Sequence, residues 1–500
     1  MIRKFSTALR PSQIPRPSIE KPLITCKNAR FNLYLSHVRD TKVKFKSIPL
    51  ASDGWYHRKS KGDFFLIHPT VEGILENAYQ VSSISNEINS EILKNLENEF
   101  EIENLTDIQV KSIPQIISGN HVLIAAETGC GKTLAYLIPI IQNILNTKEK
   151  LKSRKLNSPL AMILTPGREL ATQISEVVSK LTKNTDLKVK AVLGGNTKQQ
   201  MKNPEFEDID IFVGTMGATT KLVTTGIYRI NEVRHVVLDE ADTLLDNSFK
   251  EKLNIFLKKF PFYKISSELK NSNEIATQLI LVSATMPTNL RDLLLNIIDT
   301  ETIYEVVSPN LHKLLPHVQQ KFLRMNKSDR PAALVSLVKS ELNKNRPIIV
   351  FANKTPTSDF VSIFLNESGV NCINLNGDML MKVRIGRFEQ FQKGNVDVLA
   401  TTDVASRGLD TKRARHVINF DFPIHMSDYI HRCGRIGRVG TLEKCFVTNY
   451  ISGRSEISTV QRIEHAARTG GYLPNVDANI TQIIEQKILK ELGDIDESTF

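Results

Sequence analysis

Short apolar segments alternate with longer amphipathic segments along most of this chain. Each apolar segment ends at small or polar residues and precedes a stretch with apolar residues at helical spacing. This alternation predicts an α/β fold with doubly wound parallel sheets and functional residues at the carboxyl ends of the strands. The predicted strands are His121–Ala125, Ala161–Leu164, Val189–Leu193, Ile209–Val213, Val233–Leu238 and Gln278–Val282, then Pro347–Phe351, Asn371–Leu375, Val396–Ala400, His416–Asn419 and Lys444–Thr448.

The two sets of strands predict two tandem domains, since 500 residues are too many for one hydrophobic core. No apolar run approaches the length that a membrane span needs, so we expect no membrane insertion. The predicted boundaries are 84–305 for the first domain, 306–318 for a flexible hinge that contains Pro309 and Pro316, 319–475 for the second domain, and 476–500 for a tail with several acids.

The formal net charge of +11 is concentrated at the amino end of the chain. Residues 1–62 hold 14 Lys/Arg and 3 Asp/Glu, so the other residues hold 51 of each sign. Charge alone therefore does not predict nucleic-acid binding by the two domains. Residues 1–19 contain no acid and mix Arg and Lys with Ser and Thr, a composition typical of a mitochondrial transit peptide; a disordered basic tail is the alternative. Residues 20–83 then form a basic N-terminal extension.

A glycine-rich loop follows the first predicted strand and precedes an apolar helix. Gly129 and Gly131 allow the backbone to approach an anion that the helix N-terminus faces. Lys132 is placed to reach the β and γ phosphates of a nucleotide, and Thr133 to ligate Mg²⁺. Ala126 stands where the strict consensus has glycine, and an accidental glycine-rich turn is the alternative. The loop consists of Ala126, Glu127, Thr128, Gly129, Cys130, Gly131, Lys132 and Thr133.

Acidic residues follow the predicted strand Val233–Leu238, in the order Asp239-Glu240-Ala241-Asp242. Asp239 is placed to hold Mg²⁺ through water, and Glu240 to orient an attacking water molecule. Such a tetrad on its own is more often a solvated turn. Its position after a buried strand and downstream of a phosphate loop favours a nucleotide-hydrolysis site.

These motifs resemble those of the DEAD-box RNA helicases. The match continues with Ser283-Ala284-Thr285, with the segment from Thr402 to Asp410 and with the segment from His431 to Arg438, and it covers residues 84–475. The chain is similar overall to a fungal mitochondrial member. The resemblance implies two RecA-like domains, ATP and Mg²⁺ as cofactors, RNA as the substrate, and ATP hydrolysis coupled to local unwinding of RNA.

The resemblance also implies roles for individual residues. Gln109 is similar to the glutamine that reads the adenine edge, and Asp403 to the residue that meets the ribose. Arg435 and Arg438 resemble arginine fingers that reach the γ-phosphate, and His431 resembles a residue that couples the two domains.

Further residues match family positions that touch RNA or link hydrolysis to RNA release. The family's RNA contacts position phosphate and sugar without reading bases, and each residue taken alone is equally compatible with an ordinary turn or an exposed position. The implied coupling residues are Asp242, Ser283 and Thr285. The implied RNA contacts are Arg168, Gly194, Gly195, Thr215, Gly377, Asp378, Arg384 and Thr402.

Several positions depart from the family's pattern. Ile102 and Ile84 stand where aromatic residues usually lie, and Phe100 is a candidate replacement for the ring that stacks on adenine. Ala218 stands where the family has an RNA-contacting Arg, and Met381 where it has Gln. The hydrolytic residues are thus complete while the RNA contacts are fewer. We hypothesise that the basic N-terminal arm or a protein partner supplies additional RNA affinity.

The sequence therefore predicts a monomeric ATP-dependent RNA helicase in the mitochondrial matrix. Its expected substrate is structured mitochondrial rRNA or precursor RNA, in assembly of the large ribosomal subunit alongside ribosome-assembly proteins. An ATP-gated RNA clamp or assembly scaffold is one alternative, and a helicase for intron splicing or translation is another. A DNA helicase is a third alternative, which the motifs favour least.

Overall fold

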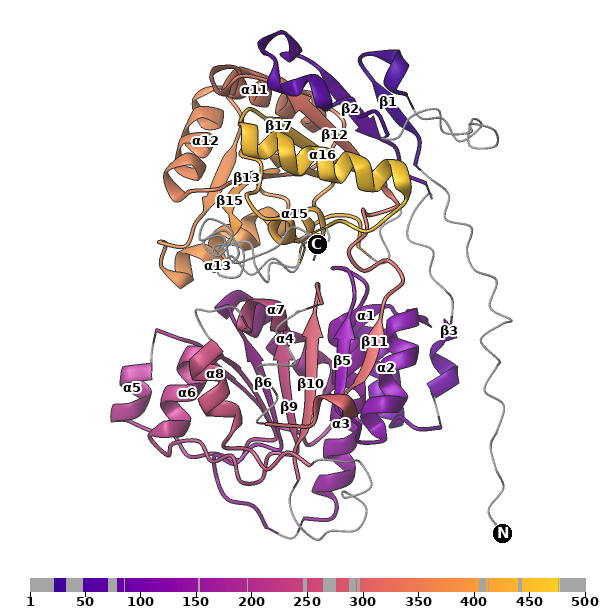
Figure 1. Ribbon diagram of the computed structural model, residues 1–500. Coiled ribbons are helices and arrows are strands. Elements are labelled where there is room, and N and C mark those ends of the chain that lie inside the picture. Colours follow the sequence, from indigo (N-terminus) through magenta and orange to yellow (C-terminus); the bar gives the residue numbers. More distant parts are fainter. Residues whose placement is uncertain are drawn as a thin grey trace, which may run out of the picture.

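The computed structural model describes residues 22–32, 48–70, 79–84, 86–151, 153–195, 197–245, 250–263, 276–286, 294, 297–403, 411, 413–438, 443–474 and 476. These residues form two α/β domains, each built on a sheet of mostly parallel strands (Figure 1). The predicted fold class is confirmed. The predicted leader, residues 1–19, lies outside the described residues, as does all of the predicted tail except Val476.

The first domain contains a seven-stranded sheet in the order β11-β5-β10-β9-β6-β8-β7. All of its pairings are parallel, so the carboxyl ends of the strands share one edge, and the strand arrows point towards the second domain (Figure 1). Its strands are β5 (Val122–Ala125), β6 (Ala161–Thr165), β7 (Val189–Val192), β8 (Ile211–Thr215), β9 (His235–Asp239), β10 (Gln278–Ser283) and β11 (Tyr304–Val307). A separate pair, β3 (Tyr79–Gln80) and β4 (Asn104–Leu105), is antiparallel.

Helices cover both faces of this sheet because successive strand residues point to opposite sides. Ile124 belongs to a buried cluster with α1 to α4, whereas its neighbour Leu123 belongs to a cluster with α6 to α8. The helices are α1 (Ser90–Phe100), α2 (Asp107–Ile117), α3 (Lys132–Lys148), α4 (Arg168–Leu181), α5 (Thr197–Lys202), α6 (Met216–Thr224), α7 (Ala241–Leu244) and α8 (Lys250–Leu257).

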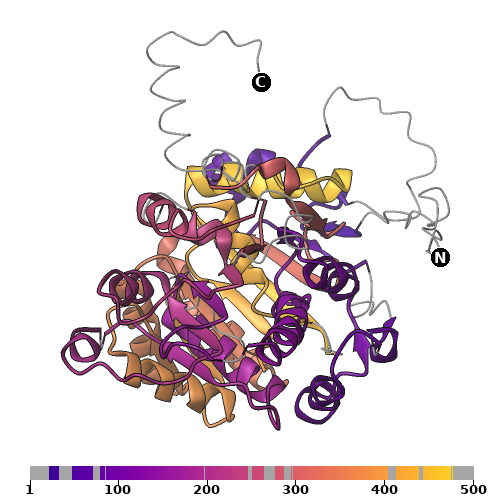
Figure 2. The same cartoon turned by 90° about the horizontal axis from the view of Figure 1, so that it is seen from below.

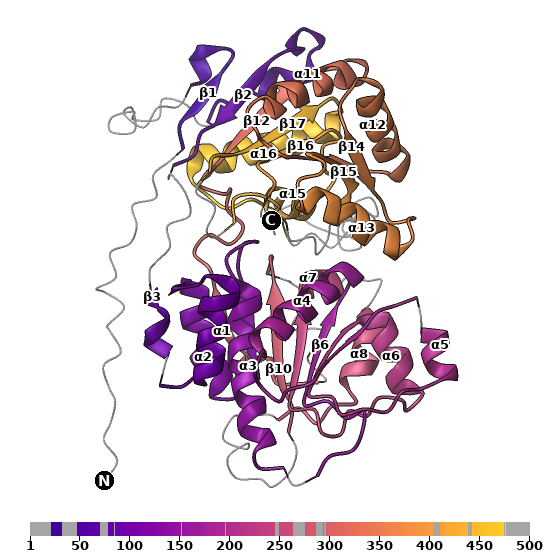
Figure 3. The ribbon, with the colours of Figure 1, turned by 180° about the vertical axis from the view of Figure 1, so that it is seen from behind.

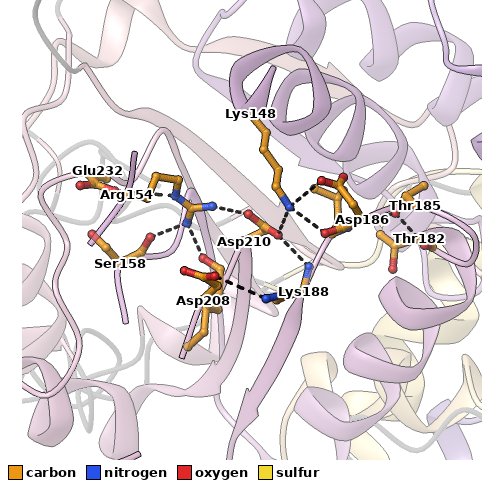
Figure 4. Close-up of polar contacts among 12 residues, drawn as sticks. Lys148, Arg154, Ser158, Thr182, Thr185, Asp186, Lys188, Asp208, Asp210 and Glu232 are labelled. Atoms are coloured by element: carbon orange, nitrogen blue, oxygen red, sulfur yellow. Dashed lines mark hydrogen bonds and ion pairs between the residues drawn. The ribbon is translucent and has the colours of Figure 1, made fainter. Parts of the chain in front are cut away.

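A buried ion network fixes the far end of α3, the helix that follows the phosphate loop (Figure 4). Asp210, just before β8, is 1% exposed and pairs with Lys148 at 3.0 Å and with Arg154. The backbone N–H of Lys188 donates to the same carboxylate at 2.7 Å. Because α3 is held at the amino ends of the strands, its first turn has a fixed position at their carboxyl ends.

The second domain contains an eight-stranded sheet in the order β1-β2-β12-β17-β16-β13-β15-β14. Its strands are β1 (Ile24–Cys26), β2 (Phe64–Ile67), β12 (Val318–Arg324), β13 (Ile348–Ala352), β14 (Cys372–Leu375), β15 (Val398–Thr402), β16 (His416–Asn419) and β17 (Cys445–Ile451). Its helices are α11 (Arg330–Leu342), α12 (Thr355–Glu367), α13 (Met381–Gln392), α15 (Met426–Cys433) and α16 (Arg454–Thr469). In the described part of the chain, no helix combines the length and apolar character needed to cross a bilayer.

Strands β1 and β2 precede the first domain in sequence but belong to the second domain (Figure 3). Strand β2 pairs antiparallel with β12, which places Phe65 opposite Phe322 with their rings stacked 4.7 Å apart. Trp55 is 1% exposed and lies 5.6 Å from the Phe65 ring. Part of the basic extension predicted over residues 20–83 is therefore folded into the core of the second domain.

Glu464 of α16 anchors this N-terminal segment through a buried carboxylate. It accepts hydrogen bonds from the backbone N–H groups of Ala51 at 2.7 Å and Ser52 at 3.0 Å, and from the Ser52 hydroxyl at 2.6 Å. Arg468, one helical turn later, pairs with the same carboxylate at 2.7 Å. The segment consequently lies against α16, as the view from below shows (Figure 2).

We expect Glu464→Ala to destabilise the second domain by about 3–5 kcal/mol, because it leaves the Arg468 charge buried without its partner. Trp55 is the chain's only tryptophan, so its fluorescence reports directly on whether the segment stays docked. The expected result is a red-shifted emission and a lower midpoint of thermal unfolding. Glu367→Ala, at an exposed position in α12, is the control and should change neither. Unchanged Trp55 emission in Glu464→Ala would contradict the anchoring role.

The segment between the domains runs from Ser308 to His317, because β11 ends at Val307 and β12 begins at Val318. It lies inside the predicted hinge of residues 306–318. His312 contacts both domains: its Nε2 accepts from the backbone N–H of Met286 at 3.0 Å, and its carbonyl accepts from that of Leu473 at 2.7 Å.

Candidate active site between the two domains

The phosphate loop joins β5 to α3 with both of its predicted glycines in the left-handed region, Gly129 at φ +85° and Gly131 at φ +88°. Lys132 folds back over the loop and donates to the carbonyl oxygens of Ala126 at 2.6 Å and Glu127 at 2.8 Å. The lysine ammonium thus lies inside the loop. The oxygens of a bound anion would compete with these two carbonyl oxygens for its hydrogen bonds.

Gln109 supports this loop from α2. Its Nε2 donates to the Gly131 carbonyl at 3.2 Å, and its Oε1 accepts from the backbone N–H of Thr106 at 2.8 Å in a capping box. The Thr106 hydroxyl donates to the Cys130 carbonyl at 3.0 Å. A Cβ at position 131 would lie 2.6 Å from Gln109 Nε2, so any other residue there would displace this amide. The structure therefore brings Gln109 to the phosphate loop.

Asp239 and Glu240 lie beside the loop, at the carboxyl end of β9. The Tyr136 hydroxyl donates to Asp239 Oδ2 at 2.9 Å. Burial and the neighbouring Glu240 raise the pKa of Asp239 to about 6, although the Tyr136 hydrogen bond opposes the change. Tyr136 was not predicted as a site residue, although its position four residues after Lys132, on the same helical face, was the available signal.

Asp242 connects the first domain to the second. Its Oδ2 accepts from the Thr285 hydroxyl at 3.0 Å and lies 3.6 Å from Nε2 of His431 in α15. Burial alone raises the pKa of Asp242, but the nearby His431 imidazole and the hydrogen bond from Thr285 outweigh it and hold that pKa well below its usual range. Ser283 Oγ accepts from the backbone N–H of Thr285 at 3.1 Å. The predicted coupling residues Asp242, Ser283 and Thr285 thus lie in one cluster with His431.

The second domain lies directly on the phosphate loop. A Cβ added to Gly434 would lie 1.3 Å from the Thr128 hydroxyl, and one added to Gly129 would lie 2.8 Å from Cγ of Arg438. Burial lowers the pKa of Arg438 to about 10, which still leaves its guanidinium charged near neutral pH. Arg435 is 5% exposed, and its Nε donates to the His431 carbonyl at 3.2 Å.

Asp403 has a partner that sequence analysis did not assign. Both of its carboxylate oxygens accept from Arg432, each at 2.6 Å. The Arg432 side chain is 1% exposed, and it also donates to the side chains of Asn353 at 2.6 Å and Asn419 at 3.1 Å. Arg432 therefore ties α15 to the ends of the neighbouring strands. The rest of the predicted segment after Asp403, residues 404–410, lies outside the described residues.

A cleft of about 1180 Å³ lies between the domains and is lined by both. Phe100 and Ile102 line it, and Lys180 lies over the Phe100 ring at 5.8 Å. Ile84 is 6% exposed and packs in the core of the first domain. The predicted site residues that line the cleft are Gln109, Thr128, Gly129, Gly131, Lys132, Thr133, Asp239, Glu240, Ser283, Arg384, His431, Arg435 and Arg438.

The predicted RNA contacts fall into groups on the two domains. A Cβ at Gly194 or Gly195 would lie 3.3 or 3.5 Å from the Arg168 guanidinium, so these three residues are in contact. Arg384 of α13 pairs with Glu169 at 2.6 Å, which joins the second domain to the residue after Arg168. Glu169 was not predicted as a site residue from its sequence position. Thr215 and Thr402 end β8 and β15, and Gly377 and Asp378 lie in the exposed turn after β14.

The fold and the cleft define a two-domain α/β protein with a cleft lined by both domains, and comparison with known proteins identifies the class. The DEAD/DEAH box helicase family model matches residues 106–293, and the helicase conserved C-terminal domain model matches residues 329–440. The chain belongs to the DEAD-box ATP-dependent RNA helicases. It is therefore an ATP-hydrolysing enzyme that acts on RNA.

Individual relatives extend this similarity over nearly the whole chain. The mouse (Mus musculus) protein named "Probable ATP-dependent RNA helicase DDX28" is 34% identical over 95% of this chain and 90% of its own length. Its human (Homo sapiens) counterpart is 33% identical over 95% of this chain and 89% of its own length. The structure of Mss116p bound to ssRNA and AMP-PNP has a TM-score of 0.67 at 26% identity and covers 80% of each chain.

Proposed function

We propose that this chain hydrolyses ATP in the cleft with groups supplied by both domains. Lys132 binds the β and γ phosphates, and Glu240 orients the attacking water. Arg435 and Arg438 bring positive charge from the second domain. The main support is the direct contact of Arg438 with Gly129 of the phosphate loop. Catalysis of phosphoryl transfer consists mainly of positioning and charge neutralisation, which this arrangement supplies.

Mg²⁺ fits the first-domain side of the cleft. The raised pKa of Asp239 means that a cation beside this buried carboxylate would stabilise its charged form. Thr128 Oγ1 and Glu240 Oε2 are buried without a hydrogen-bond partner among the described residues, which suits a polar ligand. Asp239, through water, and Thr133 would hold the ion, which neutralises phosphate charge when bound.

We propose that ATP replaces the hydrogen bonds that now hold parts of the loop. Gln109 turns from the Gly131 carbonyl to the adenine edge, and Asp403 contacts the ribose while Arg432 holds it. The contact of His431 with Asp242 links this closed arrangement to Ser283 and Thr285. Binding of ATP and RNA then favours closure jointly, and each ligand raises the affinity for the other by the same factor.

RNA binds, in this proposal, along the groups of residues that the two domains bring together. The Arg384–Glu169 ion pair joins the segment containing Arg168 to α13, so closure aligns the contacts of both domains. A closed site that fits only a bent single strand displaces the complementary strand. The proposed contacts are Arg168, Gly194, Gly195, Thr215, Gly377, Asp378, Arg384 and Thr402.

We further propose that the protein acts as a monomer in the mitochondrial matrix, on large-subunit rRNA during ribosome assembly and together with assembly proteins. The acid-free composition of residues 1–19 supports import. Similarity to the structure of Mss116p bound to ssRNA and AMP-PNP supports single-stranded RNA and an adenine nucleotide as ligands.

Crosslinking of the protein to RNA in isolated mitochondria, followed by sequencing of the bound fragments, tests the substrate. We expect fragments of large-subunit rRNA to be enriched over their abundance in total mitochondrial RNA. Enrichment of intron or messenger RNA instead would contradict the assembly role. Recovery of the full-length chain in the cytosolic fraction would contradict the predicted location.

An ATP-gated RNA clamp is a second candidate function. It is favoured because this chain lacks some of the residues with which the family contacts RNA. Ala218 removes one cation from the family's pattern, and the guanidinium of Arg384 is already paired with Glu169. Displacement of one strand from a short duplex distinguishes the two candidates. A helicase separates the strands upon ATP addition, whereas a clamp retains the duplex while it hydrolyses ATP.

A further inference from the structure

A basic turn on the second domain is held in one conformation by its surroundings. It spans Trp55 to Lys61 and lies between the buried Trp55 ring and β2. The Ser60 hydroxyl donates to the carbonyls of Trp55 at 3.0 Å and His57 at 2.7 Å. The Arg324 side chain of β12 donates through Nε to the Trp55 carbonyl at 3.1 Å. The backbone carbonyl of Arg324 accepts from the backbone N–H of Gly62 at 2.8 Å. The turn is therefore part of the second domain rather than a free arm.

The charged side chains of this turn point to solvent. Arg58, Lys59 and Lys61 are all exposed, and no ion pair between described residues includes any of them. Asp63, the nearest following acid, is already paired with Lys27 at 3.1 Å. Three exposed cations, none with an ion-pair partner in the described part of the chain, create a local positive field that suits an anionic partner.

A shallow groove on α16 adjoins the basic turn. Its volume is about 400 Å³, and Tyr472, 65% exposed, forms part of its wall. The Tyr56 hydroxyl donates to Gln461 at 3.4 Å, which joins the turn to the groove, and the Tyr56 ring is 46% exposed. Asp53, an exposed acid on this surface, accepts from Gln461 at 3.3 Å. The groove is lined by Ser458, Gln461, Arg462, His465, Ala466, Tyr472 and Pro474.

We propose that the basic turn and the α16 groove together bind single-stranded RNA outside the inter-domain cleft. Cations of the turn contact phosphates, Arg462 extends the positive surface, and the rings of Tyr56 and Tyr472 stack on bases. Exposed aromatic rings beside cations are the combination that sequence-independent single-strand binding uses. This surface lies on one domain, so it holds RNA whether or not ATP has closed the cleft. This surface compensates for the family's RNA contacts that are absent inside the cleft.

Deletion of residues 20–62 is unsuited to testing this surface, because it removes Trp55 and Leu50 from the core of the second domain. We therefore choose the triple variant Arg58→Ala, Lys59→Ala and Lys61→Ala, with Trp55 emission as the check that the turn stays folded. The matched control is Lys155→Ala, Lys258→Ala and Lys259→Ala, three exposed lysines near the amino ends of the first-domain strands. ATP hydrolysis without RNA should be unchanged in both triple variants.

Affinity for a long oligouridylate, measured across salt concentrations without nucleotide, gives the main readout. The loss of three phosphate contacts should reduce the slope of log affinity against log salt concentration by about 2. Tyr472→Ala should weaken binding about five-fold or more, whereas Tyr472→Phe retains the ring and the affinity. The loss of RNA affinity in the triple variant should be the same with a non-hydrolysable ATP analogue, because this surface does not depend on closure of the two domains.

Equal affinity and equal salt slope in the basic-turn variant and its control would overturn the proposal. A loss that appears only with the ATP analogue would also overturn it, because it would place the effect in the cleft. Vesicles of phosphatidylglycerol and phosphatidylcholine serve as the competing probe. If the triple variant loses binding to these vesicles while its RNA affinity is unchanged, the surface serves a membrane and not RNA.

Discussion

Replacement of Arg435 by alanine is expected to slow RNA-stimulated ATP hydrolysis by roughly 10³–10⁵-fold, equivalent to about 4–7 kcal/mol of transition-state stabilisation. Arg435 lines the cleft from the second domain, opposite the phosphate loop. Its guanidinium would meet the charge that develops on the transferred phosphoryl group once the domains close. ATP binding should persist in this variant, because Lys132 and Gln109 belong to the first domain.

Lys132→Ala provides the contrasting result. It should abolish hydrolysis too, but with weaker nucleotide binding, since this ammonium lies within the phosphate loop. Arg229→Ala, at an exposed position of the first domain, serves as the control and should hydrolyse ATP normally. Steady-state phosphate release at the wild-type rate in Arg435→Ala or in Lys132→Ala would contradict the assigned roles.

Gly434→Ala should reduce RNA-stimulated hydrolysis by at least about 10³-fold, because it keeps the arginines away from the nucleotide. Gly434 adopts φ −71° and ψ 1°, a conformation that alanine also adopts, so the substitution itself strains no backbone dihedral angle. The obstacle is the Thr128 side chain, whose hydroxyl lies 1.3 Å from the added Cβ and whose own Cβ lies 2.5 Å away. Each domain should fold normally while the closed state is lost.

A double-mutant cycle separates this effect from a general defect. Thr128→Gly removes the atoms that the new Cβ meets, so Gly434→Ala should cost far less in that background. Gly386→Ala in α13 is the matched control, since a Cβ there meets no atom of the described residues within 4 Å. Full activity of Gly434→Ala, or an equal loss in both backgrounds, would show that this contact does not form during turnover.

Local sequence patterns predicted the strands of both sheets that carry the site. The apolar runs before Ala126 and Asp239 are buried on both faces, as parallel strands covered by helices are, and their short length and flanking small or polar residues indicated strands. The chemistry at their ends follows from topology, because parallel strands bring their carboxyl ends to one edge. The predicted phosphate loop and acidic residues therefore lie together.

Strands β1, β2 and β12 could not be predicted in the same way. Strand β12 contains polar residues inside the domain, such as Gln320, which is 1% exposed and accepts from Tyr429, so it lacks an apolar run. Strand β2 pairs with β12 across more than half of the sequence, and no local pattern encodes that pairing. The surrounding positive charge favoured an interpretation of residues 20–83 as a basic N-terminal extension outside the two domains.

Within the site, the missed residues act through contacts between distant parts of the chain. Tyr136 reaches Asp239, Arg432 holds Asp403, and Glu169 pairs with Arg384 of the other domain. Each pair lies on different elements, so its geometry depends on tertiary packing. Spacing within a motif identifies the groups that face the ligand more readily than those that hold them in position.

A structure of the protein bound to single-stranded RNA and a non-hydrolysable ATP analogue tests the shared active site most directly. The deciding quantity is the distance from the Arg435 and Arg438 guanidinium groups to the oxygens of the terminal phosphate held by Lys132. We predict hydrogen-bond distances for at least one arginine, with Gly434 seated against Thr128. Both arginines remote from the phosphate, in a complex that still hydrolyses ATP when given the natural nucleotide, would contradict the account.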